Sequence, residues 1–88
     1  MKTVKIYTDR GHGWAAVKTK ELRALGIAGQ ISHYSYQRGQ TAYLEEDCDL
    51  SVYLAAIKAA GHEPQFVEKH TDQRSPIRSY NTYSEAAQ

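Results

Sequence analysis

Three tyrosines fall on alternate positions within residues 32–44, around an Arg-Gly pair that is typical of a two-residue turn. In a hairpin, Tyr34, Tyr36 and Tyr43 would share one face of a sheet, with Arg38 at the tip of the turn. Tyrosine buries a large apolar area while its hydroxyl stays hydrated, and nucleobases stack on its ring. We predict that these four residues bind a partner, although the same alternation also suits a face packed beneath a helix.

A glycine-containing loop over residues 9–14 holds a second set of polar and aromatic groups. Asp9 and His12 offer an acid and a base, and the glycines leave backbone amides exposed. No serine nucleophile and no phosphate-loop lysine completes a catalytic set. We therefore expect a binding protein rather than an enzyme, with His12 and Trp14 as secondary binding candidates.

The basic residues near the end of the sequence form a third candidate. Arg74 and Arg78 flank a Ser-Pro pair, and Tyr80 follows closely. Arginine forms bidentate hydrogen bonds with phosphate and carboxylate groups, so this segment could hold an anion. A solvated terminus is the alternative for the same residues.

The spacing of the histidines and the cysteine does not predict a metal site or a reactive thiol. The chain has four histidines and one cysteine, Cys48, and none of them forms a Cys-x2-Cys or His-x3-His pair. The acidic run at residues 45–49 stands where a long helix should begin, so its charges favour the helix dipole and oppose a thiolate at Cys48. We expect no metal, no cofactor and no catalytic cysteine.

The helix predicted over residues 49–60 has the clearest pattern in the chain. Its apolar residues recur at i, i+3, i+4 and i+7 and form one stripe: Leu50, Tyr53, Leu54 and Ile57. We expect Asp47 or Asp49 to cap its start and Gly61 to end it. A shorter helix is predicted over residues 20–25, with Thr19 as its cap and Gly26 after its end.

Extended patterns predict the strands that these helices cover. The expected strands are residues 3–8, 14–17, 31–36, 41–46, 65–70 and 77–80. Val4 and Ile6 should face the core, and a polar tail should begin near residue 81. The fold expected is α+β: an antiparallel sheet of four to six strands, with the main helix packed on one face.

Length and composition agree with one small domain over residues 1–88. The chain is 41% hydrophobic and 24% charged, which is typical of globular proteins. It lacks an apolar run long enough to span a bilayer, and its first residues lack the apolar centre of a signal peptide, so we expect a cytoplasmic protein without membrane contact. Net charge is +5 over residues 1–40 and −4 over residues 41–88, a division that could mark a nucleic-acid surface or vanish by mixing in the fold.

Four segments, residues 7–14, 34–39, 43–49 and 77–80, resemble small proteins encoded by bacteriophages and conjugative plasmids. The resemblance implies a mobile-element accessory protein, and no catalytic residue carries over from it. The function expected is inhibition of a host defence system, of the CRISPR or restriction type, by binding a host protein. Nucleic-acid binding through the basic first half and capture of a small nucleotide signal are the alternatives, and a homodimer is left open.

Overall fold

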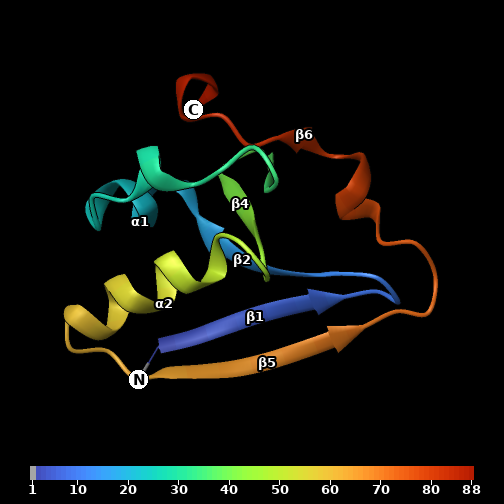
Figure 1. Ribbon diagram of the computed structural model, residues 1–88, viewed down its shortest axis with the longest axis horizontal. Helices are drawn as coiled ribbons and strands as arrows, with labels where there is room; N and C mark the ends of the chain where they lie inside the picture. Colours follow the sequence, from blue (N-terminus) through green and yellow to red (C-terminus); the bar gives the residue numbers. More distant parts are fainter. Residues whose placement is uncertain (1) are drawn as a thin grey trace.

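The computed structural model describes residues 2–88. Two α-helices pack on one face of a six-stranded sheet and form an α+β domain (Figure 1). The helices are α1 (Thr19–Ala24) and α2 (Leu50–Ala59). The strands, in the spatial order β5-β1-β2-β4-β3-β6, are β1 (Lys2–Thr8), β2 (Gly13–Lys18), β3 (Tyr36–Arg38), β4 (Thr41–Glu45), β5 (Pro64–His70) and β6 (Asn81–Thr82). Within the described residues, neither helix has the length and apolar composition needed to cross a membrane.

The sheet is mixed, whereas the sequence predicted antiparallel pairing throughout. β5 runs parallel to β1, from Lys2 opposite Pro64 to Thr8 opposite His70, and the other pairs are antiparallel. A parallel neighbour needs a long crossover, and α2 supplies part of it between β4 and β5. The alternation in residues 65–70 predicts a strand but does not indicate whether that strand runs parallel or antiparallel to its neighbour.

The core lies between the sheet and the two helices, as the apolar patterns predict. Val4 and Ile6 point into it from β1, and Tyr53 and Ile57 meet them from the stripe of α2. The other two stripe residues are half-buried and pack at its margin. The positive φ angles just beyond the helices, +74° at Gly26 and +89° at Gly61, confirm that both glycines terminate a helix.

The prediction that Thr19 and Asp49 cap the helix starts is wrong, because neither side chain accepts a hydrogen bond from a helix amide. Thr19 is the first residue of α1, and its hydroxyl donates to the Gln40 carbonyl instead of capping an amide. Asp49 occupies the N-cap position of α2 but caps no helix amide. Its carboxylate accepts hydrogen bonds from the Ser32 amide and from the hydroxyls of Ser32 and Ser35.

This bonding by Asp49 explains why the predicted hairpin is shorter than expected. Residues 32–35 form a turn bonded to Asp49 at the start of α2, so the first strand begins only at Tyr36. The connecting turn is Gly39-Gln40, with φ +59° at Gly39, and Arg38 is a strand residue opposite Thr41. The Arg-Gly turn predicted from sequence is therefore displaced by one residue.

Residues 77–80 do not form the predicted edge strand. Pro76 begins a 3₁₀ turn, η2 (Pro76–Ser79), and the Ser75 hydroxyl accepts a hydrogen bond from the Ile77 amide at its start. The edge strand on this side of the sheet is β6, which pairs with β3. Beyond it Tyr83 is buried and donates from its hydroxyl to the Ala28 carbonyl at 2.6 Å, so the expected polar tail contributes to the core.

The apolar stripe of α2 provides the first prediction. Ile57→Asp places a charge at a fully buried position, and an unpaired buried charge costs more than about 4 kcal/mol of stability. We expect loss of the cooperative thermal transition followed by circular dichroism. Ala55→Asp, at an exposed position of the same helix, should unfold close to wild type. Equal melting of the two variants would contradict this core assignment.

Candidate binding site

The sheet face opposite the helices, here called the open face, carries most of the predicted binding residues. The strand registers place Tyr7 beside Trp14, Ala16 beside Tyr43, and Tyr43 beside Tyr36. Directly opposite residues lie on the same face of a sheet, so these side chains form one continuous surface. The alternating positions Ala42 and Leu44 are buried on the helix side. This settles the question left open by alternation: Tyr36 and Tyr43 lie opposite the helices, not beneath them.

Asp9 ties the C-terminal segment to one end of the open face. Arg78 donates to its carboxylate from Nε at 2.6 Å and from Nη2 at 2.9 Å. Backbone amides of Gly11, His12 and Ser75 donate at 2.9, 2.9 and 3.1 Å. The Arg78 hydrogen bonds and these amides outweigh the effect of burial and hold the pKa of Asp9 well below its usual range. Asp9 is therefore an ionised anchor that joins two distant segments.

Residues 76–80 lie against aromatic rings of the sheet as a result. The Arg78 guanidinium lies 5.4 Å from the centre of the Trp14 ring, and the Tyr80 ring lies 5.1 Å from that of Tyr43. Arg38 in turn lies 5.2 Å from the Tyr80 ring and donates to its hydroxyl at 3.3 Å. Among the hollows that border this segment, one is lined by Trp14 and another by three tyrosines.

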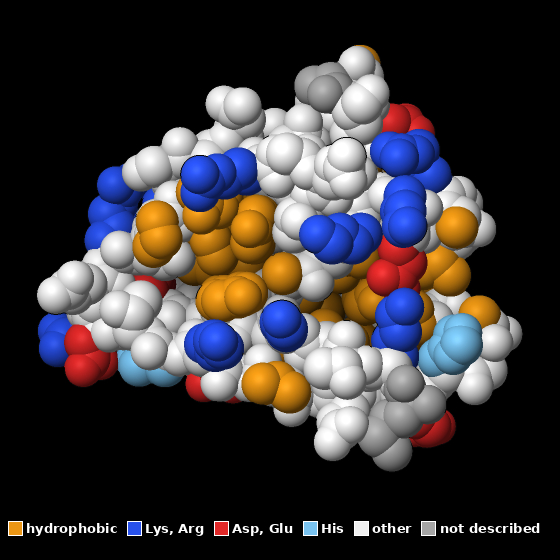
Figure 2. All heavy atoms as spheres, turned by 180° about the vertical axis from the view of Figure 1, so that it is seen from behind, with side chains coloured by type: hydrophobic (Ala, Val, Ile, Leu, Met, Phe, Trp, Pro, Cys, Tyr) orange, Lys and Arg blue, Asp and Glu red, His pale blue; other side chains and the backbone are white. Residues whose placement is uncertain are grey.

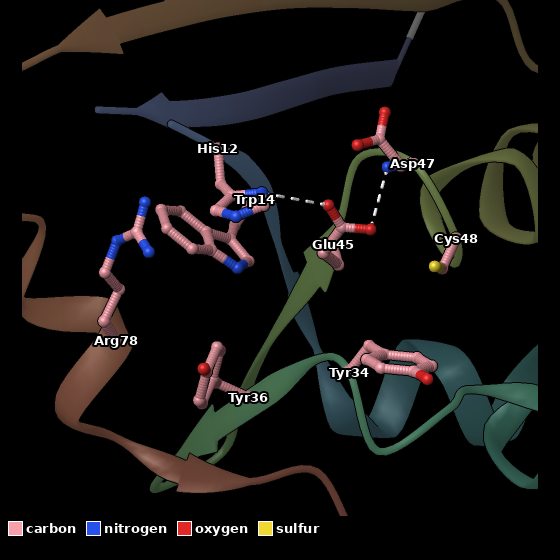
Figure 3. Close-up of a pocket in the computed structure, with 8 residues that line it drawn as sticks. All are labelled: His12, Trp14, Tyr34, Tyr36, Glu45, Asp47, Cys48 and Arg78. Carbon is pink, nitrogen blue, oxygen red and sulfur yellow. Dashed lines mark hydrogen bonds and ion pairs between the residues drawn. The ribbon is translucent and has the colours of Figure 1, made fainter. Parts of the chain in front are cut away.

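The first hollow, here called the Trp14 pocket, has a volume of about 320 Å³ (Figure 3). Its lining residues come from four separate segments of the chain: His12, Trp14, Tyr34, Tyr36, Glu45, Asp47, Cys48 and Arg78. Trp14 is only 2% exposed, and its Nε1 has no hydrogen-bond partner among the described residues. In Figure 3 the indole nitrogen faces the space between Tyr34 and Tyr36. A buried donor without an acceptor is rare, so this atom is the unusual feature of the pocket.

Glu45 is the buried carboxylate of the Trp14 pocket. Its Oε2 accepts the Asp47 amide at 2.9 Å, and its Oε1 lies 3.7 Å from Nδ1 of His12. The neighbouring Glu45 carboxylate, with burial and the nearby negative charges, raises the pKa of the Cys48 thiol. The thiol therefore stays protonated near neutral pH, which does not favour a nucleophilic role.

His12, Glu45 and Asp47 could also hold a metal ion. Their ligating atoms all lie within 4.8 Å of one another, and one imidazole with two carboxylates suits zinc or manganese. The spacing rules could not find this group because His12 and Glu45 are brought together only by the pairing of β2 with β4.

The second hollow, here called the tyrosine hollow, has a volume of about 260 Å³ and lies beside Tyr7, Tyr43 and Tyr80. The Tyr7 and Tyr43 rings meet edge to face at 6.4 Å. Burial and then the neighbouring Tyr80 and Tyr7 raise the pKa of Tyr43, so its hydroxyl is neutral at physiological pH. Figure 2 shows this side of the molecule, where Lys and Arg side chains border an apolar area.

The structure separates most of the predicted site residues into two groups, one that lines the Trp14 pocket and one beside the tyrosine hollow. Tyr36 lies between the groups, because it is opposite Tyr43 and its ring packs edge-on to Trp14 at 6.3 Å. Tyr34, predicted on the sheet, lies in the turn before β3 and lines the Trp14 pocket. Arg74 borders neither hollow and donates to the Ser79 hydroxyl at 3.4 Å.

Sequence reasoning missed several residues of these hollows. They are Tyr7, Glu45 and Lys69, and Lys5 was missed beside them on the open face. A signal was present for the first two, because Lys5 and Tyr7 alternate with the buried Val4 and Ile6. Glu45 was assigned to the helix dipole, and no pattern placed Lys69 beside Tyr7 because that contact depends on the parallel pairing. Comparison of the chain with family models, with curated proteins and with solved structures finds no match.

The Asp9 anchor predicts a particular pH dependence. Because its folded pKa lies below its unfolded value of about 4, its contribution is complete above that pH and is lost as the pH falls further. Asp9→Asn should lower the melting temperature at pH 7 and flatten the loss of stability between about pH 4 and pH 2. Asp72→Asn, which alters an exposed carboxylate, is the matched control. A wild-type acid profile in Asp9→Asn would show that Arg78 does not stabilise the fold through Asp9.

Proposed function

We propose that this protein is a binding module for single-stranded nucleic acid, with the open face as its contact surface. The observation that supports it best is the set of cations that share the open face with the tyrosines: Lys5, Lys18, Arg38 and Lys69. All are exposed, and within the described residues none forms an ion pair with an acidic side chain. Lys2, by contrast, is paired with Glu21 at 2.9 Å.

Unpaired cations on one face favour a polyanionic partner. Each lysine or arginine that neutralises a phosphate releases a condensed counterion, which provides most of the sequence-independent affinity for nucleic acid. Among the paired strand residues whose side chains lie on the open face, Glu45 is the only one with a carboxylate. It is buried in the Trp14 pocket. Little negative charge therefore opposes the approach of a phosphate chain to Lys5, Lys18 and Lys69.

The tyrosines favour single strands over duplexes. A base stacked on an aromatic side chain contributes about 1–3 kcal/mol, and only unpaired bases expose their faces for this contact. Tyr7, Tyr43 and Tyr80 are each half-buried, so they are fixed by packing yet accessible from the hollow. Their hydroxyls add hydrogen-bonding groups to the surface.

A second candidate is the inhibition of a host defence system by protein binding, in the mobile-element context that the resemblance implies. It is favoured by Tyr34, whose side chain is 61% exposed and stacks on His33 at 4.5 Å between ring centres. Tyrosine and arginine are frequent interface anchors. Tyr34 is the better anchor of the hairpin region, because Tyr36 packs against Trp14 and Arg38 lies over Tyr80.

The two functions respond differently to nuclease. In a capture experiment from host lysate, a protein partner held by Tyr34 should survive nuclease treatment and be lost in Tyr34→Ala. The fold should be unaffected, because this side chain is exposed. His62→Ala, at an exposed position after α2, is the control. Retention of the same nuclease-resistant partner by Tyr34→Ala would exclude Tyr34 as the anchor.

The nucleic-acid proposal predicts a salt-dependent affinity. Fluorescence anisotropy with labelled single-stranded RNA and DNA should show a log-log salt slope that falls by about 0.7 for each lost phosphate contact. Lys5→Gln, Lys18→Gln and Lys69→Gln should each reduce the slope by this amount. Lys58→Gln changes the net charge equally, but on α2, behind the sheet, and should leave the slope unchanged. Absence of any salt-sensitive binding by the wild type at low ionic strength would exclude the proposal.

A further inference from the structure

We propose that the Trp14 pocket holds a single nucleobase and that its polar groups fit the Watson–Crick edge of guanine. The inference rests on the proposed function, because a strand bound on the open face is the source from which we expect the base to come. Tyr36 belongs to both surfaces, opposite Tyr43 and in contact with Trp14. A base next to the tyrosine hollow can therefore enter the pocket without leaving the protein surface.

The indole nitrogen of Trp14 supplies the first specific contact. Its N–H is buried and has no acceptor within the described residues, which leaves an unsatisfied donor in the ligand-free protein. A carbonyl oxygen of a bound base would satisfy it. The base reaches this atom by displacing the half-buried Tyr36 ring, which packs edge-on to the indole.

Glu45 supplies the complementary acceptor. It lies directly opposite Trp14 in the pairing of β2 with β4, so the two side chains share one face and are near neighbours. A carboxylate has about four lone-pair sites, and the Asp47 amide, the Cys48 thiol and His12 account for at most three. At least one site remains for a donor of the ligand.

Guanine presents the pattern that matches these two groups. Its N1–H and N2–H donors stand beside the O6 carbonyl, so Glu45 can accept while the Trp14 nitrogen donates. Adenine has no carbonyl group, and cytosine has no ring N–H beside its carbonyl. Uracil has one ring N–H between two carbonyls and can form only part of the pattern. We therefore expect guanine to bind best and uracil second.

The remaining lining residues fit the rest of a nucleotide. Tyr34 and Tyr36 offer rings for stacking on the base. Arg78 is held by Asp9 through Nε and Nη2, and its Nη1 has no hydrogen bond within the described residues, so it can donate to a phosphate. The same guanine chemistry could come from a base in a strand or from free guanosine monophosphate, and the experiment separates the two.

Trp14 is the only tryptophan in the chain and reports on its own pocket. We would titrate the wild type with GMP, UMP, CMP and AMP, and with short oligonucleotides of each base, following tryptophan fluorescence. The expected result is quenching or a spectral shift at concentrations roughly tenfold lower for guanine than for adenine, in line with the discrimination of a good bidentate contact. Because these titrations use the wild type, their result does not depend on whether a variant folds.

The role of Glu45 is tested by one variant and a control that changes the net charge by the same amount. Glu45→Gln should remove the preference for guanine, because an amide offers one acceptor oxygen in place of a carboxylate. Glu46→Gln alters the adjacent exposed carboxylate and should keep the preference. Thermal unfolding of both proteins checks that the fold is intact.

The outcomes separate the pocket from the proposed function. Salt-sensitive strand binding with a guanine preference seen by Trp14 supports both. Strand binding without any base preference supports the function and overturns the guanine pocket. A response to GMP without strand binding supports the pocket, with a free nucleotide as ligand, and overturns the function. No response to any nucleotide or oligonucleotide overturns both.

Discussion

The carboxylate of Asp9 is the interaction on which the rest of the site depends. It receives hydrogen bonds from the loop after β1 and from the segment before β6, which are separated by more than sixty residues. An ionised acceptor with this many donors is favourable despite its burial, because charge-assisted bonds replace the lost hydration. It fixes Arg78 over Trp14 and, together with the contacts of Tyr80 with Tyr43 and Arg38, holds residues 76–80 on the sheet. The hollows of the open face are consequences of that attachment.

A second aspartate positions the other segments that line the Trp14 pocket. Asp49 sits at the start of α2, but its carboxylate binds Ser32 and Ser35 and so bends the preceding chain into a turn. The Ser35 hydroxyl also accepts the Glu45 amide at 2.9 Å. This network positions the edges of the Trp14 pocket, with Tyr34 on one side and Glu45 on the other. Two buried carboxylates thus decide where short irregular segments meet a regular sheet.

The distribution of charge follows from the fold rather than from position along the chain. The excess of positive charge in the first half contributes Lys5, Lys18 and Arg38 to the open face, but Lys69 comes from the acidic second half. Glu68, next to it, points to the other side because side chains alternate along β5. The charges of the two halves therefore mix in the fold, and these four cations lie on one face of the sheet.

Local patterns determined the regular elements of this protein. The apolar stripe of α2, the glycines beyond both helices and the alternation in β1 and β4 each concern residues within a few positions of one another, so short-range sterics and burial decide them. Tertiary structure decided the direction of β5, the turn at residues 32–35 and the conversion of residues 76–79 into a 3₁₀ turn. It also decided that His12, Glu45 and Arg78 line one pocket. The reason is physical: each of these features depends on a partner distant in the chain, and a linear pattern does not encode which distant donor an aspartate will bind.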